Sequence, residues 1–179
     1  MPAKKYWFAV VISAMCIIGI WAARVFALTD KQMSLNEVKA VFVFVQGLTE
    51  EAEKAGLTEG QIRADVAEKL KRAGIKVVSE KDGQKLPGKP VLYVNVSAPK
   101  RKSEMAFVYH IDIGLLQEAA LVRNPRIITM AITWSNGRLG YCPSTEFVKS
   151  ARETIDYLMV KFLADYTIAN PVAGANTGD

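Results

Sequence analysis

The sequence predicts an α+β domain, with a mixed, mainly antiparallel sheet of five or six strands and two helices packed on one face, in the order β-α-β-β-β-β-α. Three observations predict this class. Residues 41–45 are an unbroken β-branched and aromatic run. Residues 58–74 carry apolar side chains at helical intervals and lead directly into a short apolar run. Several strand-like runs then precede one long amphipathic segment.

The first half of the chain predicts a strand, a helix and a second strand. Residues 41–45, Val-Phe-Val-Phe-Val, are typical of a strand covered on both faces. Thr58 and Gln61 have capping-box spacing, and the helix that they begin is expected to end at Gly74. Residues 75–78 resume as a strand, and this order predicts a crossover connection between two parallel strands. Residues 49–54 and 79–90 are expected to be polar connections.

The second half predicts antiparallel strands. Residues 91–97 alternate in polarity, and residues 107–121 form one long strand, or two with a bulge near Gln117. Asn124-Pro125 is expected to turn the chain into a strand over residues 127–134.

Two further elements complete the prediction. Asn136-Gly137 favours a tight hairpin leading to a short return strand at residues 139–141. The last helix is expected to begin near Ser144 or Thr145 and to end at Asn170. Its apolar stripe consists of Phe147, Val148, Ala151, Ile155, Leu158, Phe162, Leu163 and Tyr166.

The first 27 residues have the layout of a secretory signal peptide. Lys4 and Lys5 precede an uncharged apolar run over residues 8–20, and the preferred cleavage site lies before Leu28. The alternative is an uncleaved anchor over residues 7–23. We therefore expect a single domain over residues 28–171 and a flexible tail over 172–179. The expected location is periplasmic or secreted, or else the inner membrane if residues 7–23 anchor the chain.

The charge distribution argues against a nucleic-acid partner. The chain has 23 basic and 18 acidic residues, but Lys4, Lys5 and Arg24 precede residue 28 and every acidic residue follows it. Residues 28–179 thus carry 20 basic and 18 acidic groups, a net charge of +2. Nucleic-acid recognition needs a clustered basic face, which this balance does not favour.

No pattern of residues predicts catalysis, a metal or a cofactor. His110 is the only histidine and shares a strand face with Asp112, whereas a metal site needs three or four ligands. Cys142 is the only cysteine after residue 27, and a Cys142–His110 pair would lack a recognisable orienting group. Burial of Cys142 is the simpler interpretation. Phosphate-binding glycine loops and a nucleophile elbow are also absent, so we expect a non-enzymatic protein without cofactors.

Two groups of residues predict an interaction surface. Trp134, Asn136 and Arg138 surround the predicted hairpin, and tryptophan and arginine are favoured at interfaces. The alternative is that Trp134 packs under the terminal helix. Lys100, Arg101 and Lys102 form a basic turn, which is a contact for an acidic partner or a solvated hairpin tip.

Several of these patterns together resemble uncharacterised exported bacterial α+β proteins over residues 40–171. The resemblance rests on Gly56-Leu57-Thr58, on Val66-x-x-Lys69-Leu70-x-x-Ala73-Gly74-Ile75-x-Val77, on Thr133-Trp134-Ser135, and on Phe162-Leu163-x-Asp165-Tyr166 with Asn170-Pro171. The order of elements is similar to that of small envelope domains such as the amino-terminal domain of the Tol-system propeller protein and the curli-secretion lipoprotein. The resemblance implies an envelope location and supplies no catalytic residue.

These observations predict an exported, non-enzymatic domain that acts through contacts with envelope proteins. Membrane contact is expected only through the amino-terminal segment, if that segment stays uncleaved. The alternative is a small-ligand or lipid-related binding domain with a pocket between the terminal helix and the sheet.

Overall fold

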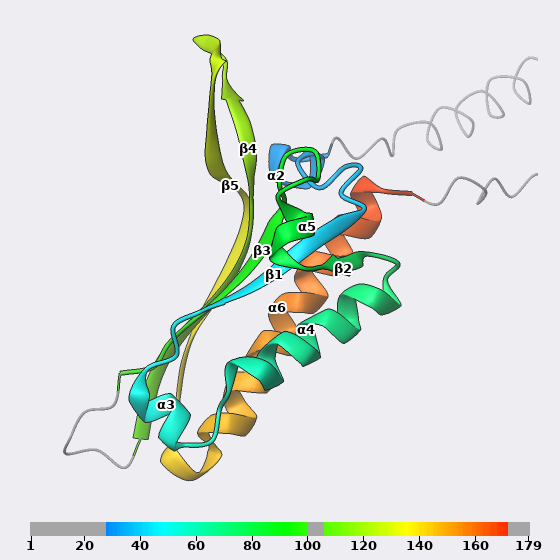
Figure 1. Cartoon of the computed structure of the whole chain (residues 1–179). Helices are drawn as coiled ribbons and strands as arrows, with labels where there is room; N and C mark the ends of the chain where they lie inside the picture. The colour runs from blue at the N-terminus through cyan, green and yellow to red at the C-terminus, as the bar shows by residue number, and fades with distance from the viewer. Residues whose placement is uncertain (1–27, 100–105, 172–179) are drawn as a thin grey trace, which may run out of the picture.

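A five-stranded mixed sheet with the strand order β2-β1-β3-β4-β5 forms the centre of the fold (Figure 1). The computed structural model describes residues 28–99 and 106–171. The predicted leader or anchor (1–27), the basic turn and the predicted tail (172–179) lie outside the described residues.

The parallel half of the sheet is built from β1 (Ala40–Gln46), β2 (Lys76–Val78) and β3 (Val91–Ser97). β1 pairs in parallel with both neighbours, which confirms the predicted parallel crossover. One expectation for β1 is wrong, because Phe44 is 44% exposed and the strand is fully covered on one face only. Both long helices lie on the face opposite Phe44, and the short helix α5 lies against Phe42.

Helix α4 (Glu59–Arg72) connects β1 to β2 and begins where the sequence predicts. The Thr58 side chain accepts a hydrogen bond from the backbone N–H of Gln61, and the Gln61 side chain accepts one from the N–H of Thr58. Gly74 follows the helix with a φ of 79°, in the left-handed conformation that glycine adopts at little cost. The buried face of the helix consists of Ile62, Val66 and Leu70.

Three short helices lie outside this predicted pattern. α3 (Glu50–Lys54) occupies the stretch expected to be a polar connection, because Thr49 caps it and three glutamates in its first turn favour the positive helix end. α5 (Glu80–Gly83) forms in the same way behind Ser79. α2 (Asp30–Met33) precedes β1 and contacts the end of the terminal helix.

The antiparallel half consists of β3, β4 (Ala106–Leu121) and β5 (Asn124–Pro143). β5 is one continuous strand, so the predicted Asn136-Gly137 hairpin and return strand are wrong. Asn136 pairs with Ile113 and Gly137 with Asp112, because β4 is long enough to pair with the whole run. The chain reverses just before Asn124, and a register shift lies between Leu115 and Leu116.

The terminal helix α6 (Phe147–Ala169) follows a single 3-10 turn, η1 (Ser144–Glu146). It contacts β4 and β5, while α4 contacts β1 and β2, so the two long helices lie side by side on one face of the sheet (Figure 1). This arrangement confirms the predicted α+β class. Within the described residues, no helix is long and apolar enough to span a membrane.

β4 and β5 continue beyond the other strands as a two-stranded ribbon (Figure 1). The pairing of β3 with β4 ends at Val91 and Leu116. Residues 117–131 form the projecting part, which we call the ribbon, and the pair Leu116–Ile132 lies at its base. We call the sheet face turned away from α4 and α6 the outer face.

Candidate functional site

Trp134 lies in the core and not on the surface. It is 1% exposed, and its ring meets the Phe162 ring of α6 edge-on, with the centroids 5.1 Å apart. Its Nε1–H donates to Asp165 Oδ2 at 2.9 Å, and Asp165 Oδ1 accepts from Gln32 Nε2 at 2.8 Å. The predicted surface role of Trp134 is therefore wrong, and the alternative that it packs under the terminal helix is confirmed.

Asn136 and Arg138 do not form one surface with Trp134. Asn136 is partly buried in the middle of β5. Arg138 is exposed, and its guanidinium carbon lies 5.0 Å from the centroid of the Tyr157 ring on α6. Lys100, Arg101 and Lys102 lie outside the described residues.

His110 and Asp112 belong to a small polar cluster on the outer face. Asp112 Oδ1 lies 3.3 Å from His110 Nδ1 and accepts from Asn95 Nδ2 at 3.0 Å. The pKa of the Tyr93 hydroxyl is raised, mainly because the group is partly buried and secondly because the Asp112 carboxylate lies nearby. Within the described residues, no three His, Cys, Asp or Glu side chains are placed to hold a metal.

Cys142 is separated from His110 by the sheet itself. Cys142 is buried and pairs with Phe107, whose side chain lies in the core on the helix-covered face. His110 pairs with Leu139, whose side chain is exposed on the outer face. The predicted burial of Cys142 is confirmed, and the Cys–His arrangement that nucleophilic catalysis would need is not formed.

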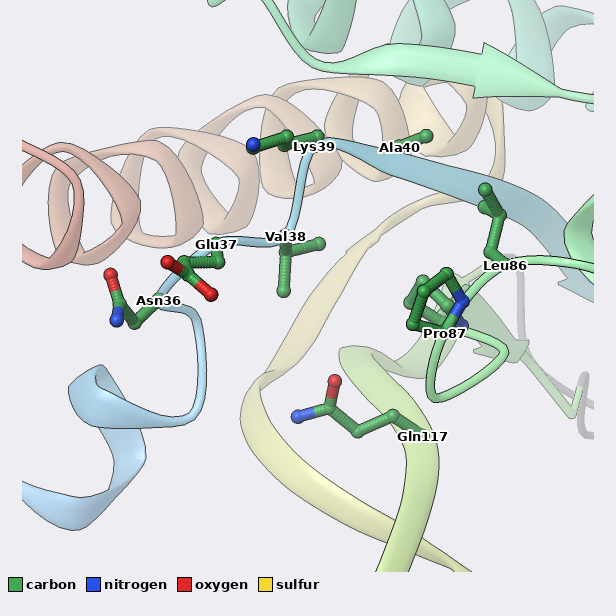
Figure 2. Close-up of a pocket in the computed structure, with 9 residues that line it drawn as sticks. Asn36, Glu37, Val38, Lys39, Ala40, Leu86, Pro87 and Gln117 are labelled. Carbon is green, nitrogen blue, oxygen red and sulfur yellow. The ribbon is translucent and has the colours of Figure 1, made fainter.

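A pocket of about 490 Å³ lies at the base of the ribbon (Figure 2). Figure 2 shows the segment before β1, with Glu37 and Lys39, facing Pro87 of the loop before β3 and Gln117 of β4. The Gln117 amide already donates to the Ser34 carbonyl and to Thr133 Oγ1, each at 2.9 Å. Glu37 and Lys39 add one negative and one positive charge to the lining of the pocket.

A second pocket, of about 370 Å³, lies between α6 and the sheet, where the ligand-binding alternative places one. Its walls include Tyr109 and Arg138 from the strands and Glu153 and Thr154 from the helix. The Tyr109 hydroxyl lies 3.3 Å from Thr154 Oγ1. These hydroxyls and charges suit a polar ligand better than a lipid chain.

The most unusual surface is one that the sequence did not reveal. Ile128, Met130 and Ile132 of β5 are 61%, 44% and 57% exposed, and we call them the ribbon stripe. Alternate residues share one face of a strand, and their partners Ala120, Glu118 and Leu116 share that face with them.

The ribbon stripe continues the outer face of the sheet, and one of its three paired residues on β4 is charged. The one charged partner, Glu118, is paired with Lys89 Nζ at 2.7 Å. At the other end of the outer face Val108, Leu139 and Tyr141 are also exposed. The signal for the ribbon stripe was the uncharged run Ile-Ile-Thr-Met-Ala-Ile at 127–132, which sequence alone does not distinguish from a core strand.

No protein-family model and no curated protein matches the sequence. Among solved structures, the chain is similar to two PelC dodecamers from Paraburkholderia phytofirmans, one of them a variant. The variant is 17% identical over 72% of this chain and 87% of its own, with a TM-score of 0.41. The other is 18% identical over 72% of this chain and 86% of its own, with a TM-score of 0.40. At these values the likeness carries no argument about fold or function.

Proposed function

We propose that this chain is an exported, non-enzymatic protein that acts in the cell envelope through protein contacts made along β5. The observation that carries the proposal is the ribbon stripe together with the β5 edge at residues 127–132, which pairs with no described element other than β4. Export rests on the signal-like residues 1–27. The contact surface comprises the β5 edge, the ribbon stripe and the exposed outer face near Leu139 and Tyr141.

Edge strands in monomeric proteins usually carry features that prevent pairing with other chains. β5 is 20 residues long and lies at the edge of the sheet. Residues 127–132 contain no charge, no proline and no glycine, whereas the carbonyls of Thr133 and Ser135 already accept from Ser34 Oγ and Lys31 Nζ. Isolated exposed apolar side chains are ordinary, but a row of them along an unguarded edge favours an interaction surface.

The magnitudes indicate how large the interface has to be. Completing the burial of three side chains that are about half exposed contributes roughly 3 kcal/mol. Each new ladder hydrogen bond adds about 1 kcal/mol. Association costs an estimated ~4–15 kcal/mol. The ribbon stripe and edge of one chain therefore need a partner that contributes comparable apolar surface of its own.

Photo-crosslinking in cells tests this proposal. A photoreactive amino acid replaces Met130 in the full-length chain, and the control places it at Glu68, an exposed position on α4. We expect protein adducts from position 130 that are lost when Ile128 and Ile132 are both changed to serine. Equal adducts from positions 130 and 68, or adducts indifferent to the serine substitutions, would contradict a contact along β5.

Small-ligand binding is the second candidate function, and the pocket between α6 and the sheet favours it. Arg138 contributes a positive charge and Glu153 a negative charge to the wall of this pocket, which suits a polar or zwitterionic molecule. A thermal-shift screen of polar metabolites against the full chain tests it. A stabilising compound whose effect disappears in Arg138→Ala and persists in Lys71→Ala would support this role.

A further inference from the structure

We infer that the partner of the ribbon is a second copy of this chain, paired antiparallel through β5 with a two-fold axis at Met130. The inference rests on the proposed function, because it names the protein that the β5 edge contacts.

The edges of the sheet are unequal. β2 has three residues, so it has room for only a short ladder with another strand. Beyond Leu116, β4 also lacks its β3 partner, but this stretch ends at Leu121 and the Glu118 N–H already donates to the Gly88 carbonyl. β5 has 20 residues, and in the described chain the recorded hydrogen bonds of residues 127–132 run to β4 and to no other element. A head-to-tail contact of β5 with β2 would leave most of β5 unpaired. β5 of a second copy matches it in length, and the same surface on both subunits closes the assembly as a dimer.

The register follows from the irregularities of β5. Its ladder with β4 shifts between Leu115 and Leu116 and again between Ala120 and Leu121, which leaves residues 128–132 as a regular stretch. Met130 is the middle residue of that stretch. A two-fold axis perpendicular to a sheet keeps the faces of both copies on the same side, and directly opposed residues share a face. The axis must therefore pass beside a residue and not between two residues.

An axis at Met130 joins the two ribbon stripes into one apolar surface. Met130 lies opposite the partner's Met130, and Ile128 lies opposite the partner's Ile132. The Arg126 side chains of the two copies do not meet, because they are separated by eight residues along the strand, roughly 26 Å. The facing flanks of the two ribbon stripes contact each other across the new ladder, so each chain supplies apolar surface to the same contact.

A lipid surface is the main competing occupant, because Arg123 and Arg126 flank the apolar ribbon. Insertion would place the unpaired N–H and C=O groups of the β5 edge in hydrocarbon, where each costs several kcal/mol. A second strand satisfies the same groups by completing the ladder. The backbone therefore favours a protein strand over lipid.

Cysteine cross-linking of the full-length chain tests the register. Met130→Cys is expected to form an intermolecular disulfide under mild oxidation, since opposed residues lie about 4.5–5.5 Å apart at Cα, within disulfide range. Ile128→Cys is the matched control, because it is on the same stripe but about 13 Å from its symmetry mate. Its yield should equal that of wild type, in which Cys16 and Cys142 set the background. A mixture of Ile128→Cys and Ile132→Cys chains should cross-link to each other.

The mass of the full chain in solution tests the dimer itself. Sedimentation should give twice the protomer mass. Met130→Lys would place the ammonium groups of the two copies opposite each other and should raise the dimer dissociation constant at least ~100-fold. Far-UV circular dichroism should be unchanged, because Met130 is half exposed.

Three results would overturn the inference. The first is a chain that stays monomeric, and the second is equal cross-linking of the two cysteine variants. The third is a monomer that binds vesicles of phosphatidylglycerol and phosphatidylethanolamine through the ribbon. If adducts at position 130 contain another protein while the chain is monomeric, the proposed function stands and the self-pairing fails.

Discussion

Gly140→Ala is expected to destabilise the fold by about 2 kcal/mol, although it adds a single methyl group. Gly140 pairs directly with Tyr109 across β4 and β5, and an added Cβ would lie 2.2 Å from the Cζ atom of the tyrosine ring. The ring cannot move aside cheaply, because Tyr109 is buried and its hydroxyl lies 3.3 Å from Thr154 Oγ1. Overpacking of this kind typically costs ~1–3 kcal/mol.

Gly137→Ala provides the matched comparison on the same strand. An added Cβ there would lie 3.0 Å from His110 Nε2, at the far end of an exposed side chain, and 3.2 Å from Asp112 Cβ. His110 can turn away into solvent, the Asp112 contact needs only a small shift, and alanine has a smaller entropy cost than glycine in a strand. We therefore expect Gly137→Ala to cost less than about 1 kcal/mol of unfolding free energy.

Urea unfolding of the full chain, followed by far-UV circular dichroism, measures both changes. In a Tyr109→Ala background, Gly140→Ala should cost almost nothing, because the clashing ring is gone. Gly114 and Tyr93 form the same kind of pair, with 2.4 Å to Cε1, and provide a second test where Tyr109→Ala is too unstable. Equal costs for Gly140→Ala and Gly137→Ala, or a cost that persists without the ring, would refute the packing argument.

Three further changes follow from single contacts. Trp134→Phe removes the indole N–H that Asp165 accepts and should cost ~1.5–3 kcal/mol of unfolding free energy, and a double-mutant cycle with Asp165→Asn should show coupling. Thr58→Ala removes the cap of α4 and should lower stability by about 1 kcal/mol in urea unfolding. Because the pKa of Tyr93 is raised in the folded chain, its contribution to stability is present below pH ~10 and is lost as the pH rises through the folded pKa. Ultraviolet titration against Tyr93→Phe should locate that step, and Asp112→Asn should lower it only in part, since burial is the larger cause.

Local chemistry made the first half of the fold predictable from sequence. The Thr58–Gln61 capping box and Gly74 mark both ends of α4 through groups that lie within a few residues of each other. The β-branched run at residues 41–45 predicted β1, and a helix between two strands predicted their parallel pairing. The prediction of a polar connection at residues 49–54 was wrong, because the Thr49 cap and three glutamates suffice for the one-turn helix α3.

The candidate surface depended on partners that are distant in sequence. Asn136-Gly137 favours a turn in isolation, yet β4 supplies a ladder partner for both residues and keeps β5 extended. Trp134 had a surface and a core interpretation, and α6 decided between them by placing Phe162 and Asp165 against its ring. Neither contact is visible in the residues around position 134.

The sequence by itself determined the α+β class, the capped helix, the nearly balanced charge after residue 28 and a leader-like amino terminus, because each depends on composition or on neighbouring residues. Only the tertiary structure decided that residues 127–132 lie on a projecting edge and not in the core. Exposure depends on which elements end before a strand does. β3 stops pairing at Leu116, and the apolar residues beyond that point have no covering layer in the described chain.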